Sequence, residues 1–315
     1  MKNRFWLHHL ILGAALLITL PSAASAQVYG GRTQIDTTVR LDRGGAVDLS
    51  LISGRIRVTG WDRSDVKVVA SIDRGTLRLD ANSSRVSLSV DDTDHRYGGH
   101  HDIGDARYDV SVPRGARVIL EAVSGDVTST GTQGEIEASS VSGSVDVTAG
   151  VGEVSAESVS GGVHAAQING NLRAESVSGG VQVESVTGNV GASTVSGDIR
   201  LIGIKSKDVR TETVSGDIVY SGSLDPGGKY SFESHSGTLR LNIPRGAGAQ
   251  FSVETFSGDI TTDFPVTVPA GGSIRKEGRM EFTTGDGRAR VTAQTFSGRI
   301  VITSGSDSTT RRDDE

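Results

Sequence analysis

The chain has 315 residues, a formal net charge of −6 and no cysteine. The negative charge argues against a nucleic-acid partner, which would require clustered Lys and Arg, and the lack of cysteine means that the fold is held together without disulfides. Aromatic residues make up only 4% of the chain while glycine occurs 42 times, which favours a thin, turn-rich β structure over a wide globular core.

Residues 1–26 are predicted to be a secretory signal peptide. Lys2 and Arg4 supply positive charge before an apolar run at 7–20, and the small residues at 24–26 fit a cleavage site. The alternative, a membrane anchor, is disfavoured because the run is shorter than the roughly 20 residues that a helix needs to span a bilayer. We therefore expect an exported protein, in the periplasm or at the cell surface or outside the cell, with no transmembrane helix after signal removal.

Residues 27–113 are predicted to form less regular N-terminal β coils that cap one end of the molecule. A cap is needed there because an exposed strand edge would otherwise pair with other chains. Trp61 is expected to pack over the end of the core. The alternative for this residue is a role as a binding aromatic.

The segment 91–106 is a predicted loop that concentrates His and Asp, the residue types that ligate zinc and other transition metals. The adjacent pair His100 and His101 lacks a spacing that would aim both rings at one ion. A solvated loop is therefore the favoured interpretation, and no metal site is predicted. The candidates for the alternative are His95, His100, His101 and Asp102.

Residues 114–302 contain a regular repeat. A Val-Ser-Gly triplet recurs, and a second glycine lies 9 residues after most of its copies. Between these glycines, apolar residues alternate with polar ones, which is typical of strands with one buried face. We predict an all-β parallel solenoid with two short strands per coil of about 18 residues. Successive serines are 18, 18, 18, 18 and 19 residues apart: Ser124, Ser142, Ser160, Ser178, Ser196 and Ser215.

Stacked coils would place equivalent residues about 4.8 Å apart in ladders. Two ladders are predicted to fill the core, and Val177→Asp is accordingly expected to unfold the array. The first, three residues after each serine, is Val127, Val145, Val163, Val181, Ile199 and Ile218. The second, one residue before each serine, is Val123, Val141, Val159, Val177, Val195 and Val214.

From residue 222 the repeat becomes less regular, with Ser-Gly pairs at Ser236, Ser257 and Ser297. The step of 40 residues between the last two predicts one further turn, near Met280. The position before each serine holds larger side chains, which are predicted to seal a widening coil: His235, Phe256 and Phe296.

His235 is expected to be partly buried and bonded to a backbone carbonyl. Residues 303–315 are polar and of low complexity, and are predicted to be a disordered tail.

One outward ladder, three residues before each serine, is rich in Glu. Paired carboxylates such as Glu157 and Glu175 could do acid–base work, or share a cation, or pair with Arg173. A flat repeat face does not exclude water, so a solvated face is the favoured interpretation and neither a catalytic residue nor a cofactor is predicted. The ladder is Glu121, Ser139, Glu157, Glu175, Ser193, Glu212, Glu233, Glu254 and Gln294.

A calcium-binding β-roll is a further alternative for an 18-residue period. Such rolls carry Gly-Gly-x-Gly-x-Asp at each corner. This chain has Ser-Gly-Asp at only four corners and lacks the paired glycines, so calcium is disfavoured. The four aspartates are Asp126, Asp198, Asp217 and Asp259.

The sequence resembles a bacterial family of exported proteins labelled "putative adhesin", a domain of unknown function. The resemblance rests on Ile-Ser-Gly-Arg-Ile-Arg-Val-Thr-Gly-Trp-Asp at 52–62, Val-Pro-Arg-Gly at 112–115, the Val-Ser-Gly-Asp-Val type of turn, and Thr-Phe-Ser-Gly-Arg-Ile at 295–300. It covers nearly the whole predicted mature chain. It implies a β-solenoid of the cell envelope and supplies no catalytic residues.

The function predicted from the sequence is that of a non-enzymatic binding or structural module of the envelope. The partner classes are envelope polysaccharide, peptidoglycan or another envelope protein; the oligomeric state is left open. Two alternatives remain, an enzyme of the β-helix class that acts on polysaccharides and a protein that assembles end to end.

Overall fold

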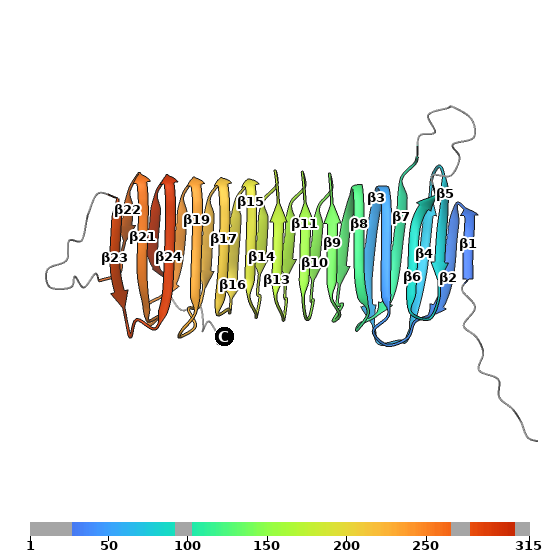
Figure 1. Ribbon diagram of the computed structural model, residues 1–315, viewed down its shortest axis with the longest axis horizontal. Helices are drawn as coiled ribbons and strands as arrows, with labels where there is room; N and C mark the ends of the chain where they lie inside the picture. Colours follow the sequence, from blue (N-terminus) through green and yellow to red (C-terminus); the bar gives the residue numbers. More distant parts are fainter. Residues whose placement is uncertain (1–26, 92–102, 266–277, 306–315) are drawn as a thin grey trace, which may run out of the picture.

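The computed structural model describes residues 27–91, 103–265 and 278–305. All the regular elements in these ranges are β-strands, and they wind into one elongated stack (Figure 1). This confirms the predicted β-solenoid. None of the elements in the described ranges is a helix long and apolar enough to cross a membrane.

Each coil contributes one strand to each of two long faces. We call these faces A and B. Two long strands bend through the corner between the faces and take part in both: β3 (Ala46–Trp61) and β8 (Arg117–Thr130). Between β8 and β20 the pairing is parallel, and from β8 to β16 it keeps register from coil to coil, as the constant step of 18 residues requires. The register shifts once between β16 and β18, near Ile202 and Ile204.

Face A runs, in spatial order, through β1 (Gln27–Arg32), β5 (Thr76–Ala81), β6 (Arg85–Asp91), β3, β8, β9 (Ile136–Ser140), β11 (Val154–Ser158), β13 (Leu172–Ser176), β15 (Val190–Ser196), β17 (Asp208–Ser215), β19 (Lys229–Ser236), β24 (Ala289–Ser297), β21 (Ala249–Ser257) and β23 (Arg279–Thr284).

Face B runs through β2 (Gln34–Arg40), β4 (Asp65–Ile72), β7 (Ala106–Pro113), β3, β8, β10 (Val145–Thr148), β12 (Val163–Ala166), β14 (Val181–Glu184), β16 (Ile199–Ile204), β18 (Ile218–Gly222), β20 (Leu239–Pro244), β25 (Ile300–Gly305) and β22 (Ile260–Thr262).

The order of the coils differs from the order of the sequence at both ends. Strands β24 and β25 form the last coil of the chain, yet they lie between the coil of β19 and β20 and the coil of β21 and β22. Near the other end, β3 likewise lies between β7 and β8. The further turn expected near Met280 is instead the antiparallel strand β23, which pairs with β21 at the outer end of face A.

The predicted position of Trp61 is wrong. Because β3 lies inside the stack, Trp61 pairs with Pro113 of β7 and does not cover the end of the core. Its indole N–H donates to the carbonyl of Asp65 at 2.8 Å, and the guanidinium of Arg63 lies 4.5 Å from its ring centroid. Antiparallel pairs, β1 with β5 and β2 with β4, form this end instead.

The core is a continuous column of small and medium apolar side chains. The ladder three residues after each serine is buried as predicted: Val181, for example, is 1% exposed. Because parallel stacking places like residues on like, every coil adds the same buried layer, and neighbouring coils supply what a single coil could not bury.

At the serine corner, a buried hydroxyl and a glycine connect neighbouring coils. The Ser158 hydroxyl donates to the Gly143 carbonyl at 2.9 Å and accepts from the Gly161 N–H at 2.9 Å. A Cβ on Gly161 would lie 2.0 Å from the Gly143 oxygen, so this approach requires glycine. The arrangement recurs at Ser140 and Ser176, and Thr194 repeats its bond to the glycine carbonyl of the preceding coil.

The final strand reaches Gly305, so the first residues of the predicted tail belong to β25. The rest of that tail and the predicted signal peptide lie outside the described residues.

Candidate binding site: an apolar stripe along one corner

The ladder one residue before each serine lies on the surface, which contradicts the predicted core position. Its six valines are between 45% and 48% exposed, whereas the residue preceding each of them is buried, Ala122 in the first case and Ser or Thr in the other five. Strand alternation explains the difference: in β11, Val154, Ala156 and Ser158 point inward, so Val159 must point outward.

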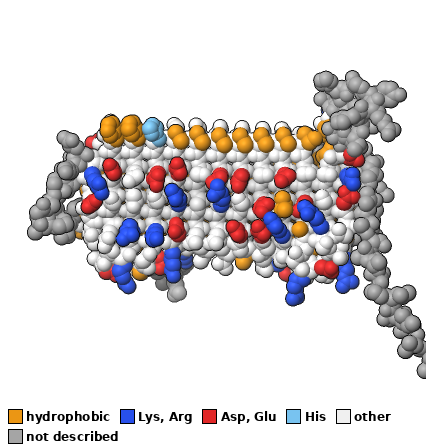
Figure 2. Space-filling model, in the orientation of Figure 1, with side chains coloured by type: hydrophobic (Ala, Val, Ile, Leu, Met, Phe, Trp, Pro, Cys, Tyr) orange, Lys and Arg blue, Asp and Glu red, His pale blue; other side chains and the backbone are white. Residues whose placement is uncertain are grey.

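This exposed ladder continues at both ends of the regular repeat. Ile52 extends it on β3, and three aromatic side chains extend it beyond Val214 in the spatial order His235, Phe296, Phe256. We call the ten residues the apolar stripe; Figure 2 shows them as a straight row along one edge of the molecule. They are Ile52, Val123, Val141, Val159, Val177, Val195, Val214, His235, Phe296 and Phe256.

The aromatic end of the stripe is an exposed stack of rings. His235 and Phe296 have centroids 4.8 Å apart at an interplanar angle of 5°, and Phe296 stacks on Phe256 at 4.8 Å and 6°. Phe256 is 78% exposed. The predictions that His235 is partly buried and that the two Phe residues seal the coil are therefore wrong. The rings stack because they occupy equivalent positions in adjacent coils.

A groove runs beside the stripe along face A. One wall is the stripe and the other is the Glu-rich ladder, here called the acidic row, which points outward as predicted. The groove consists of two adjoining hollows of about 430 and 480 Å³, which share Glu212 and Val214. Thr194 lines the first hollow and Thr213 the second. It extends from β9 to β21.

The carboxylates of the acidic row have few internal partners. Glu157 and Glu175 stack directly in register, and Glu175 pairs with Arg173 at 2.8 Å, as expected. The Glu157 carboxylate accepts a hydrogen bond from Ser155 at 3.1 Å. Apart from Glu175, which Arg173 neutralises, the glutamates of the row present negative charge parallel to the stripe.

Aspartates flank the stripe on the side of face B, and they stabilise the backbone of the next coil. Asp126 accepts hydrogen bonds from the Ser144 N–H and hydroxyl, each at 2.9 Å. Partial burial disfavours the charge of Asp217, but hydrogen bonds from the Thr238 N–H and from Arg240 outweigh that effect and hold the pKa of Asp217 below its ordinary value. These contacts give the corner aspartates a structural role.

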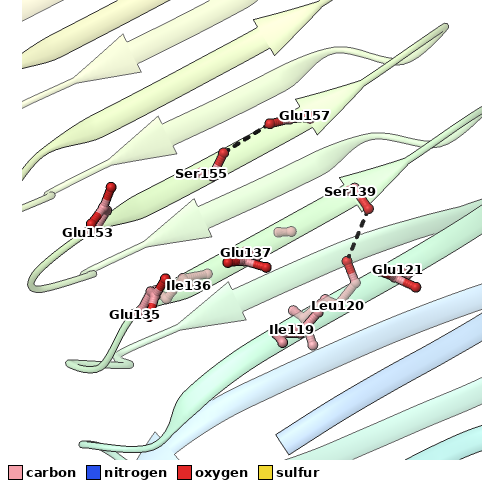
Figure 3. A pocket seen from close by; sticks show the side chains of 11 residues that line it. Ile119, Leu120, Glu121, Glu135, Ile136, Glu137, Ser139, Glu153, Ser155 and Glu157 are labelled. Carbon is pink, nitrogen blue, oxygen red and sulfur yellow. Dashed lines mark hydrogen bonds between the residues drawn. The ribbon is translucent and has the colours of Figure 1, made fainter. Parts of the chain in front are cut away.

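A third hollow, of about 370 Å³, lies farther from the stripe on face A and is lined by glutamates (Figure 3). Arg117 neutralises part of this charge through contacts with Glu135 at 3.3 Å and Glu137 at 2.8 Å. The hydrogen bond to Glu137 and the nearby carboxylates raise the pKa of Arg117. In the described part of the chain, no group of three or more His, Asp or Glu is arranged to hold a metal ion.

The candidate ligands His95, His100, His101 and Asp102 lie outside the described residues, so the structure does not test them. Valine before each serine was assigned to the core by its chemistry alone, and the stripe was therefore not predicted. The signal that could have revealed it is the parity of each strand: Ile136, Ala138 and Ser140 alternate inward, which leaves Val141 outside.

A family model described as Toastrack DUF4097 matches residues 46–303, which span both faces and the whole apolar stripe. The chain belongs to the Toastrack DUF4097 family. This confirms the resemblance found in the sequence to an adhesin-like family of unknown function. A search of curated proteins found no match to this Toastrack chain.

Three solved structures resemble the Toastrack chain at low identity, each over 86% of its length. One, a "putative cell adhesion protein" from Clostridium sporogenes, is 11% identical with a TM-score of 0.23 and 99% of its own chain covered. A "putative adhesin" from Bacteroides fragilis is 13% identical with a TM-score of 0.37 and 98% covered. A "putative lipid binding protein" from Parabacteroides distasonis is 12% identical with a TM-score of 0.34 and 98% covered.

Proposed function

We propose that the protein is a non-enzymatic, exported binding module of the bacterial envelope, and that it binds its partner along the apolar stripe and the adjoining groove. Export rests on the signal peptide predicted at residues 1–26. The observation that carries the binding role is the stripe itself.

The stripe is larger than the isolated apolar residues normal for a protein surface. With about 4.8 Å between coils, its ten residues extend about 43 Å. With roughly half of each side chain exposed, the contiguous apolar area is on the order of 600 Å², at the upper end for monomeric proteins and typical of interaction sites.

The exposed half of the stripe adds nothing to the core of a single chain. Its six valines are about half exposed. Thr at the same positions would keep the β-branched shape that strands favour, so strand formation does not require valine there. Apolar contact with a partner accounts for valine at these positions, since burial stabilises by roughly 25 cal/mol per Å².

Co-sedimentation with separated envelope fractions tests this function. The purified mature chain is mixed with peptidoglycan, envelope polysaccharide or membranes. The triple variant Val159→Thr/Val177→Thr/Val195→Thr is compared with Val69→Thr/Ile202→Thr, which changes exposed apolar residues away from the stripe. Saturable binding to one fraction, lost only in the stripe variant, is expected; equal binding by both variants would contradict the proposal.

Self-association through the stripe is a second candidate, because the same stripe on two copies could pack together. Analytical ultracentrifugation of the parent chain and the stripe variant distinguishes it, since a dimer held by the stripe would dissociate in the variant.

A further inference from the structure

We propose that the occupant of the stripe is an amphipathic α-helix of a partner protein, whose apolar row is flanked by Lys and Arg. This inference rests on the proposed function and specifies the chemistry of the partner. Three properties of the site support it: the spacing of the stripe, the width of the groove and the charge on both sides.

The spacing of the stripe fits a helix better than an extended strand. An amphipathic helix presents about one apolar residue per turn, every ~5.4 Å, against ~4.8 Å between stripe residues, so four turns accumulate a mismatch of only about 2.4 Å. An extended strand presents one side chain per face every ~6.6 Å and is out of phase by about 1.8 Å, more than a third of a step, after a single repeat.

The groove accepts a row of side chains. Its walls, such as Glu175 and Val177 of one coil, are two residues apart along a strand, or about 6.6 Å. A helix with its side chains is about 10 Å wide, so it would lie on the corner and insert one apolar row. The groove passes eight coils from β9 to β21, which at about 4.8 Å per coil matches a helix of roughly 22 residues.

Negative charge on both sides of the stripe selects a basic partner. The acidic row on face A includes Glu157, Glu212 and Glu233. On the side of face B, the corner ladder holds four aspartates against two arginines, Arg55 and Arg299 near its ends. Lys or Arg beside the apolar row of a docked helix would meet these carboxylates. A second copy of this chain would bring carboxylates against carboxylates in either relative direction, so the same charges oppose self-association.

The aromatic end provides the anchoring position. Phe256 and Phe296 form one wall of the groove there, opposite Glu233 and Glu254. Large apolar side chains and exposed rings contribute most to such interfaces. An aromatic or leucine side chain of the helix would therefore contact the ring stack while a neighbouring Lys or Arg approaches Glu233.

Fluorescence anisotropy with labelled model peptides tests the inference on the full mature chain. The probe is a 22-residue Leu/Lys peptide with leucines at helical spacing. One control peptide has Glu in place of Lys, and another alternates Leu and Lys so that its apolar face forms only in an extended strand.

Two groups of variants locate the binding. The variant Val159→Thr/Val177→Thr/Val195→Thr should bind the helical Lys peptide at least tenfold more weakly than the parent chain. The variant Glu157→Gln/Glu212→Gln/Glu233→Gln should bind this peptide at least threefold more weakly, and the affinity should depend less on salt. The matched variant Glu137→Gln/Glu153→Gln/Glu281→Gln removes the same charge elsewhere and should change affinity less than twofold.

Each contrary outcome has a distinct meaning. If the alternating peptide binds as tightly as the helical one, or if the matched charge variant weakens binding equally, the helix proposal is overturned. If no peptide binds while envelope binding still requires the stripe, the inference fails and the proposed function stands. If the parent chain forms a dimer that the stripe variant loses, the occupant is a second copy and the inference also fails.

Discussion

Two valine ladders in this molecule have the same residue type and the same period, but lie in opposite environments. The ladder that contains Val181 is buried in the core, and the ladder that contains Val177, four residues earlier, lies on the outer corner. Between them the chain turns through Ser178 and Gly179. The comparison teaches that a repeat identifies equivalent positions, whereas the direction of each side chain depends on how the strand enters the corner.

The largest difference is expected when each ladder receives a charge. Val181→Asp places an unpaired carboxylate in the core and should reduce the free energy of unfolding by more than about 4 kcal/mol, while Val177→Asp should cost less than about 1 kcal/mol. Urea denaturation followed by circular dichroism measures both. Similar losses in the two variants would show that the assignment of the ladders is wrong.

The glycines of the same corner offer a second matched pair. Gly161→Ala would place a Cβ 2.0 Å from the Gly143 carbonyl, whereas at Gly162 the nearest atom is 3.5 Å away. Because backbone stacked on both sides can hardly shift, Gly161→Ala is expected to cost roughly 2–4 kcal/mol and Gly162→Ala under about 1 kcal/mol. Thermal unfolding of both variants gives the comparison, and a destabilised Gly162→Ala with an unchanged Gly161→Ala would refute it.

Two serines at the corner should likewise differ in how much their replacement by alanine destabilises the fold. Ser158→Ala removes a buried hydroxyl that bonds Gly143 and Gly161, and should cost about 1–3 kcal/mol. Ser160→Ala changes an exposed serine and should cost less than about 0.5 kcal/mol. Urea midpoints of the two variants test this, and equal midpoints would show that the buried hydroxyl contributes nothing.

A tyrosine in the interior provides a pH-dependent test of burial. Burial, and to a lesser degree Tyr230, raises the pKa of Tyr220 above its usual value near 10. Above pH 10 the unfolded chain releases this proton while the folded chain retains it, so stability should fall by up to about 1.4 kcal/mol per pH unit. Tyr220→Phe should be less stable than the parent at neutral pH, because it loses the bond to Ser223. Its free energy of unfolding should nevertheless fall less steeply between pH 10 and 11. Identical slopes in the two proteins would contradict the buried position.

Much of the fold could be predicted from the sequence because the repeat is regular. The Ser-Gly period predicted the coils, the register of their stacking, the buried ladder of Val145 and Val163, and the outward direction of Glu157 and Glu175. These features follow from strand alternation within one coil, so local sequence is sufficient.

Two of the features that were missed depend on more than one coil. The buried hydroxyl of Ser158 reaches back to the preceding coil, and this contact is what makes serine an interior residue and Val159 an exterior one. The insertion of β24 between β19 and β21 joins residues far apart in the chain, and no local pattern records it. The candidate site needed no such contact: the alternation within β11 already places Val159 outside, but valine was assigned to the core by its chemistry alone.

The most direct test of the exposed stripe is thiol labelling, which is simple because the chain has no cysteine of its own. Val177→Cys and Val181→Cys are each treated with a maleimide under native conditions, and labelling is followed by mass spectrometry. The structure predicts that Val177→Cys reacts at the rate of an exposed thiol and that Val181→Cys reacts at least about a hundredfold more slowly until urea unfolds the chain. Protection of Val177→Cys comparable to that of Val181→Cys would contradict the stripe and every inference drawn from it.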